Sequence, residues 1–266
     1  MSSRDNFQDG FRDYTAPARD SVEAFYELNH RYQTFEFVTQ QHKRFVTSPA
    51  QTRAMTLLEA LAYLDTLVDD SDPDTDLSQL QHLLQTAETI RADGHDDWFV
   101  LTGFIHDLGK ILCLSGEPQW AVVGDTFPVG CRYSDKIIYR DFFSANPDAS
   151  NTLYQSENGI YEPGCGLRNI HMSWGHDEYL YQSVKDYLPE PALYMIRFHS
   201  FYAWHQSGAY DHLCDDHDRE MLPWVQKFNP YDLYSKADDA VKWNELRPYY
   251  LGLIEKYLPA KIDWPV

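Results

Sequence analysis

Three residues in the segment HDLGK could act together on a metal ion. His106 and Asp107 are adjacent, and Lys110 follows one helical turn later, so on a helix all three side chains lean toward one patch. An imidazole beside a carboxylate suits a borderline-hard divalent or trivalent metal. An adjacent His-Asp pair alone is common, but this one lies in an otherwise apolar helix, where a charge without a partner is costly. The segment is therefore a candidate metal site.

Three further histidines are candidate ligands, and each has a structural alternative. His82 faces away from the apolar stripe of its own helix, so periodicity alone favours a solvated histidine. His199 extends an apolar stripe and fits a buried core histidine as well as a ligand. His176 and Asp177 follow SWG at the start of a helix, which also fits a capped helix start with a surface histidine. Taken one at a time, these residues do not decide between a metal ligand and a structural histidine.

Apolar residues at helical spacing predict the elements that must position these side chains. The expected helices cover residues 57–68, 77–92, 97–114, 173–185, 191–204, 219–228 and 243–257. Asp76 or Ser78 is the expected N-cap of the second, and Asp72-Pro73 ends the first. Residues 116–166 are rich in Gly, Pro and Asn and predict loops with a short strand pair near 136–139. The pattern predicts a compact all-α bundle with one long loop region.

The bulk composition limits the class of protein. The 266 residues are 43% hydrophobic, which fits one domain over residues 19–266, preceded by a polar tail over residues 1–18. The formal net charge of -19 argues against nucleic acid or an anionic membrane as a partner. No apolar stretch approaches the length of a membrane span, and the start of the chain lacks a signal-peptide pattern. Four scattered cysteines indicate free thiols. We expect a cytoplasmic monomer.

Beyond single residues, the chain resembles the myo-inositol oxygenases, the di-iron branch of the HD-domain superfamily. The resembling segments cover nearly the whole chain from Phe11 onward: FRDYT, LVDDSDPD, QTAETIR, GFIHDLGK, GEPQWAVVGDTFPVGC, MSWGHDEYLYQ, MIRFHSFYAWH, FNPYDLYSK and LRPYYLGLIEKY. The long GEPQWAVVGDTFPVGC run is far more specific than any His-Asp pair. The chain has LVDDSDPD where animal members have LVDESDPD, and its segment before Trp98 is shorter.

The resemblance implies an HD-type fold that opens the ring of myo-inositol with O₂ to give D-glucuronate, the first step of inositol catabolism. It implies two iron ions in a mixed-valent Fe(II)/Fe(III) state, with Asp107 as the bridge. The implied ligands are His82, His106, Asp107, His176, His199 and Asp232. Lys110 is the implied catalytic residue, because its positive charge lowers the pKa of a substrate hydroxyl. The implied substrate-binding positions are Arg12, Asp69, Asp70, Ser71, Lys110, Gly124, Asp125, His199 and Ser200.

Two other classes compete with the oxygenase. HD proteins also use such clusters to activate water against phosphate esters, which predicts a metal-dependent phosphohydrolase. Its pocket should be more basic than one carrying Asp69, Asp70 and Asp125. The third class is a non-catalytic helical scaffold with a vestigial cluster, and the presence of all six implied ligands argues against it.

Overall fold

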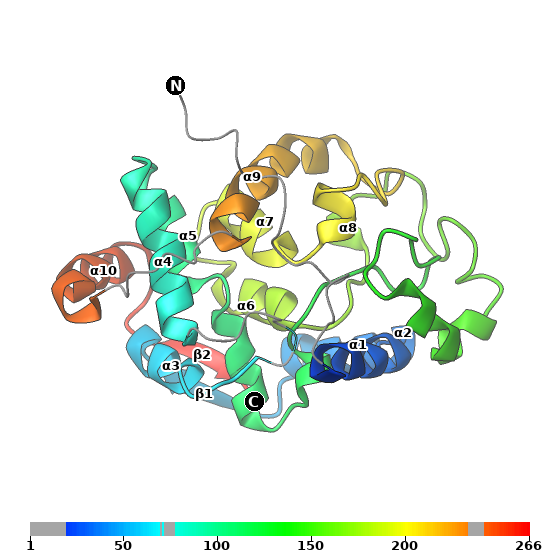
Figure 1. Cartoon of the computed structure of the whole chain (residues 1–266), viewed down its shortest axis with the longest axis horizontal. Helices are drawn as coiled ribbons and strands as arrows, with labels where there is room; N and C mark the ends of the chain where they lie inside the picture. The colour runs from blue at the N-terminus through cyan, green and yellow to red at the C-terminus, as the bar shows by residue number, and fades with distance from the viewer. Residues whose placement is uncertain (1–19, 70, 72–77, 234–241) are drawn as a thin grey trace.

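The computed structural model describes residues 20–69, 71, 78–233 and 242–266 (Figure 1). Within these residues the α-helices are α1 (Asp20–Tyr32), α2 (Phe35–His42), α3 (Leu57–Leu64), α4 (Gln79–Ala92), α5 (Asp97–Ile105), α6 (His176–Val184), α7 (Glu190–Phe198), α8 (Tyr202–His205), α9 (Asp216–Leu233) and α10 (Trp243–Tyr257). The expected all-α fold is confirmed. The expected tail over residues 1–18 lies outside the described residues.

Shorter elements complete the fold. A π-helical turn, η2 (Lys43–Thr47), continues α2, and five 3₁₀ segments follow: η3 (Leu108–Ser115), η4 (Gln119–Ala121), η5 (Arg140–Ala145), η6 (Pro147–Ser150) and η7 (Leu167–Asn169). Strands β1 (Thr52–Met55) and β2 (Ile262–Pro265) pair antiparallel, with Thr52 opposite Pro265. The small sheet thus joins the C-terminal end to the segment before α3.

Side-chain caps explain where two of the helices begin. Thr56 and Glu59 form a capping box at the start of α3, in which each side chain bonds the other's backbone N–H. Ser78 caps α4 by accepting a hydrogen bond from the Gln81 amide at 3.3 Å. Ser78 is thus the N-cap of the two residues considered, while Asp76 and the Asp72-Pro73 stop lie outside the described residues.

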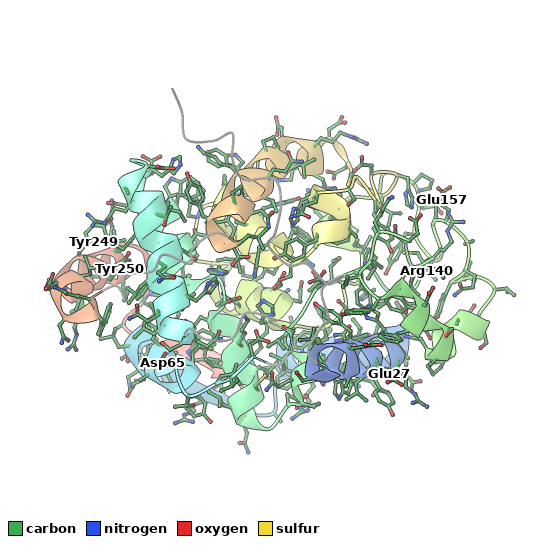
Figure 2. All side chains as sticks on the ribbon, in the orientation of Figure 1. Glu27, Asp65, Arg140, Glu157, Tyr249 and Tyr250 are labelled. Carbon is green, nitrogen blue, oxygen red and sulfur yellow. The ribbon has the colours of Figure 1, made fainter. Side chains whose placement is uncertain are left out.

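Helix α5 lies in the core, and contacts α4, α7, α9 and α10. By length and composition alone, the 19 residues Asp97–Ser115 could cross a membrane, so the expectation that no stretch approaches this length was wrong for this segment. Seventy-two per cent of its apolar window is buried inside the protein, as in the core helix of a soluble protein. Tyr250 on α10 covers one side: its ring centroid lies 4.2 Å from that of Phe104, and its hydroxyl donates to Glu88 on α4 at 2.7 Å (Figure 2).

The expected helix over residues 97–114 is interrupted at two of the candidate metal ligands, His106 and Asp107. Helix α5 ends at Ile105, His106 and Asp107 form a turn, and η3 continues as a 3₁₀ segment. A close approach accompanies the break, because a Cβ on Gly109 would collide with the His176 carbonyl oxygen. Only glycine lets η3 lie this close to the start of α6.

Other expected boundaries also changed. Residues 136–139 are turns and not a strand pair, and the expected helix over 191–204 is two helices, α7 and α8. Helix α9 continues past Phe228 to Leu233 despite Pro230. The expected helix over 57–68 ends at Leu64, and helices α1 and α2 were not predicted individually. The long loop region is confirmed as 3₁₀ turns and loops, of which η4 and η5 pack on α1. The four cysteines carry thiols and form no disulfides, as expected.

Candidate metal centre

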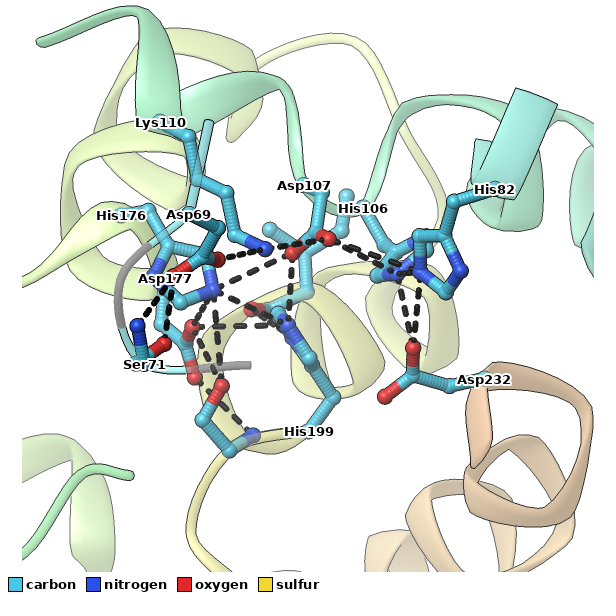
Figure 3. Close-up of polar contacts among 12 residues, drawn as sticks. Asp69, Ser71, His82, His106, Asp107, Lys110, His176, Asp177, His199 and Asp232 are labelled. Carbon is cyan, nitrogen blue, oxygen red and sulfur yellow. Dashed lines mark hydrogen bonds and ion pairs between the residues drawn. The ribbon is translucent and has the colours of Figure 1, made fainter. Parts of the chain in front are cut away.

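The Asp107 carboxylate lies between two pairs of histidines, and each of its oxygens faces one pair (Figure 3). Asp107 Oδ2 is 3.6 Å from Nε2 of both His82 and His106. Asp107 Oδ1 is 3.2 Å from His176 Nε2 and 3.5 Å from His199 Nε2. This is the arrangement of a carboxylate that can bridge two metal ions.

The first histidine pair is completed by a second carboxylate. Asp232 Oδ1 lies 3.1 Å from Nε2 of both His82 and His106, and the two Nε2 atoms are 3.3 Å apart. In the second pair, the Nε2 atoms of His176 and His199 are also 3.3 Å apart. In each half, the donor atoms of the two histidines and Asp107 lie within 4.8 Å of one another, close enough for one metal ion.

The rings of three histidines are oriented by backbone carbonyls. Nδ1 of His106 lies 2.9 Å from the Gly103 oxygen, Nδ1 of His176 lies 2.8 Å from the Val122 oxygen, and Nδ1 of His199 lies 3.0 Å from the Ile196 oxygen. A carbonyl can only accept, so Nδ1 donates and the neutral ring keeps its lone pair on Nε2. Every one of these Nε2 atoms points into the cluster, as metal ligation requires.

Five segments far apart in sequence supply the cluster. His82 lies on α4, His106 and His199 directly follow α5 and α7, His176 begins α6, and Asp232 lies near the end of α9. His106 and His199 are the C-caps of their helices, and the partial negative charge of a helix C-terminus favours a cation there. The fold therefore brings together all six residues implied as ligands.

Among the described residues, most of the centre is buried, and its two carboxylates are ionised. His106, Asp107, His176, His199 and Asp232 are buried, whereas the side chain of His82 is 20% exposed. Burial alone would raise the pKa of Asp107, but the charge of Lys110 and the interaction with His106 hold this pKa well below its usual value. The pKa of the Asp232 carboxyl is likewise held low against burial, by His106 and His82. Two anionic carboxylates thus face four imidazoles in a largely buried site, a donor set suited to a metal such as iron.

Lys110 connects the bridging carboxylate to the loop before α4. Its Nζ is 2.7 Å from Asp107 Oδ2 and 2.8 Å from Asp69 Oδ2. Asp69 Oδ1 in turn accepts from the backbone N–H of Ser71 at 2.9 Å and from its hydroxyl at 2.6 Å. Burial would lower the pKa of Lys110, but the two carboxylates raise it above its usual value, so the ammonium stays charged.

Two other implied substrate positions, Gly124 and Asp125, lie in a loop that contacts the segments of Ser71 and Ser200. A Cβ built on Gly124, whose φ is +89°, would lie 3.6 Å from Ser71 Cβ, which places the Gly124 backbone beside that loop. Asp125 accepts from the Tyr26 hydroxyl at 3.1 Å. The next residue, Thr126, donates its N–H to the carbonyl of Ser200 at 2.9 Å, which joins this loop to the residue after His199. Arg12 and Asp70 lie outside the described residues.

Sequence reasoning left Asp177 out of the site, yet the structure places it there. Asp177 is 1% exposed, and its Oδ1 lies 2.9 Å from His176 Nε2 (Figure 3). The available signal was the second His-Asp pair, which repeats the His106-Asp107 pair. From the sequence, this pair fits a capped helix start equally well, because an aspartate is favoured at a helix N-terminus as well as at a metal site.

The fold and the site together define a helical protein with a buried centre of histidines and aspartates that could hold metal. Comparison with known proteins makes the class more specific. A family model described as myo-inositol oxygenase matches residues 19–264. The chain is 52% identical over 263 residues to inositol oxygenase of Bos taurus, covering 97% of this chain and 92% of that protein.

Two other relatives extend the comparison. Inositol oxygenase of Homo sapiens is 51% identical over 260 residues, covering 96% of this chain and 90% of that protein. Inositol oxygenase 1 of Arabidopsis thaliana is 50% identical over 263 residues, covering 96% and 84%. The chain belongs to the myo-inositol oxygenase family.

Proposed function

We propose that this protein is an inositol oxygenase that opens the ring of myo-inositol with O₂ to form D-glucuronate, the first step of inositol catabolism. The observation that carries the proposal is the position of Asp107, whose two oxygens face separate histidine pairs. Each half offers two imidazoles and a shared carboxylate, the donor type of non-haem iron oxygenases. The residues that would hold the iron pair are His82, His106, Asp107, His176, His199 and Asp232.

The mixed-valent iron pair, when bound, would supply Lewis acidity toward substrate hydroxyls and the electrons for O₂ chemistry. The protein's part is to hold the substrate and to control its protons. Lys110 keeps its positive charge through Asp107 and Asp69, and this charge favours the deprotonated form of a neighbouring hydroxyl. A neutral polyol needs many hydrogen bonds and few charges, which Ser71, the Gly124 backbone and Asp125 can provide.

The competing function is a metal-dependent phosphohydrolase, which would use the same ligands to activate water. The one positive charge of Lys110 is paired with two carboxylates, Asp107 and Asp69. Among the described residues, the protein side chains at this site offer little positive charge to a multiply charged phosphate. This balance favours the uncharged substrate.

Isotope labelling separates these functions in one experiment. Protein loaded with iron and a mild reductant should consume O₂ and myo-inositol in equal amounts, and ¹⁸O₂ should label one carboxylate oxygen of the glucuronate. A phosphohydrolase would release phosphate from an ester without O₂ uptake, and a scaffold would do neither. Lack of inositol-dependent O₂ uptake by protein shown to hold two irons would refute the proposal. The monomeric state and the cytoplasmic location stay predictions.

A further inference from the structure

The carboxylate of Asp177 binds the residue that follows His199. Its Oδ2 accepts from the Ser200 backbone N–H at 3.2 Å, and its Oδ1 accepts from the Ser200 hydroxyl at 3.0 Å. Figure 3 shows Asp177 beside the second histidine pair, His176 and His199. Both residues are buried. One carboxylate at the start of α6 therefore fixes both the backbone and the side chain of the segment that leaves α7.

The remaining polar group of Ser200 is also occupied. Its carbonyl accepts from the Thr126 N–H at 2.9 Å, in the loop that carries Gly124 and Asp125. A serine hydroxyl has one proton and two lone pairs. Because the Ser200 hydroxyl donates its one proton to a hydrogen bond with Asp177, the Ser200 oxygen can only accept a further hydrogen bond. This oxygen is 3.5 Å from His176 Nε2, so it lies at the edge of the candidate metal centre.

We propose that Asp177 is a positioning residue that holds Ser200 as a hydrogen-bond acceptor for a hydroxyl of the substrate. The proposal rests on the proposed function, because it takes a polyol as the ligand. A polyol hydroxyl can donate to Ser200, whereas an ether or ketone oxygen at the same place cannot. Asp177 thereby contributes to selectivity for a ring that carries a free hydroxyl at this position.

The neighbouring residue provides a matched control. Glu178 is a buried carboxylate on the same helix, and it binds Arg197 on α7 at 2.6 Å and Gln182 at 2.7 Å. The Glu178 and Arg197 pair thus docks α6 on α7. Neither residue has a hydrogen bond or ion pair to Ser200 or to the four histidines among the contacts of the described residues. Glu178→Gln therefore perturbs helix docking, whereas Asp177→Asn perturbs the Ser200 contacts and the contact with His176 Nε2 at 2.9 Å.

The test is a double-mutant cycle on the iron-loaded, full-length protein. Affinity for myo-inositol is measured by titration calorimetry in the wild type, Asp177→Asn, Ser200→Ala and the double variant, and iron per chain is measured for each. We expect each single change to weaken binding about 10-fold, as for loss of a hydrogen bond to a charged group. The double variant should bind no more weakly than Ser200→Ala, because Asp177 acts through Ser200. Iron content should stay at the wild-type level.

Several outcomes would overturn this role. Fully additive losses in the double variant would show that Asp177 does not act through Ser200. Iron loss in Asp177→Asn would show that Asp177 is part of the metal site. If Glu178→Gln weakened the affinity for myo-inositol as much as Asp177→Asn does, the loss would come from the docking of α6 on α7. Wild-type protein that binds myo-inositol without consuming O₂ would refute the proposed reaction alone. Wild-type protein that does not bind myo-inositol would refute both.

Discussion

Replacing Lys110 by methionine tests the link between the bridging carboxylate and the substrate loop. Methionine keeps most of the side-chain length but removes the charge that pairs with Asp107 and Asp69. Lys110 is only 12% exposed, so its loss leaves Asp69 as a buried carboxylate whose remaining hydrogen-bond donor among the described residues is Ser71. Removing one partner of a buried ion pair costs about 3 to 5 kcal/mol. The Ser71 bonds place this case near the lower value, about 3 kcal/mol.

That loss should be visible as a lower melting temperature. For a chain of this size, 1 kcal/mol corresponds to roughly 2–4 °C, so calorimetry of Lys110→Met should show a decrease of about 6–12 °C. Iron per chain should stay unchanged, because Lys110 is not among the ligands. Turnover should decrease by roughly 100-fold, the typical effect of one electrostatic or acid-base contributor. Unchanged turnover at full iron content would remove Lys110 from the mechanism.

Two further variants sharpen this experiment. Adding Asp69→Asn to Lys110→Met removes the carboxylate that has lost its partner, so melting temperature should recover in part while turnover stays low. Lys256→Met is the matched surface control, because Lys256 pairs with Asp97 at 2.7 Å on the exposed side of α10. It should change neither iron content nor turnover. A decrease in melting temperature as large as that of Lys110→Met would refute the argument from burial.

Three other predictions follow from the described residues. Asp107→Ala should abolish binding of the iron pair together with O₂ uptake, and two irons with normal turnover in metal analysis would contradict the bridging role. Gly109→Ala should lower the free energy of unfolding by roughly 2 kcal/mol or more, because its Cβ meets the His176 carbonyl. Gly252→Ala, with open space on α10, should instead raise it by about 0.5–1 kcal/mol in the same denaturant titrations. His30→Gln should make the free energy of unfolding less dependent on pH in the acid range. Burial lowers the pKa of His30 to about 4 in the folded protein. The stability that the neutral His30 contributes is therefore present above pH ~6.5 and is lost as pH falls toward 4. Its removal should reduce the slope of unfolding free energy against pH by up to ~1.4 kcal/mol per pH unit, and an unchanged slope would contradict this assignment.

Much of the helical framework could be predicted from local patterns. The helical pattern from Trp243 predicts a helix that ends at Tyr257, as found, and Ser78 is one of the two caps that residue type and place predict. These features depend on neighbours within one or two turns, so the sequence contains their cause. The family resemblance likewise rests on linear segments, which do not need the fold to be recognised.

The break after α5 could not be predicted in this way. Residues 97–114 carry one continuous apolar pattern, and this pattern is the same for an α-helix and for a 3₁₀ continuation buried in the core. The change occurs at His106 and Asp107 because η3 must lie against α6, where Gly109 meets His176. A contact between segments about 70 residues apart therefore decides the local conformation.

The sequence by itself determined the chemical types of the site, the helices that carry them and the family to which the chain belongs. Only the tertiary structure decided which residues meet. His82 faces away from the apolar stripe of α4, so periodicity favoured a solvated histidine, yet Asp232 and His106 lie within 3.3 Å of its Nε2. The sequence leaves Asp177 open between a helix start and a site residue, and only the contacts with Ser200 after α7 place it at the site. The physical reason is that a metal centre is built from contacts distant in sequence, and periodicity describes only one element at a time.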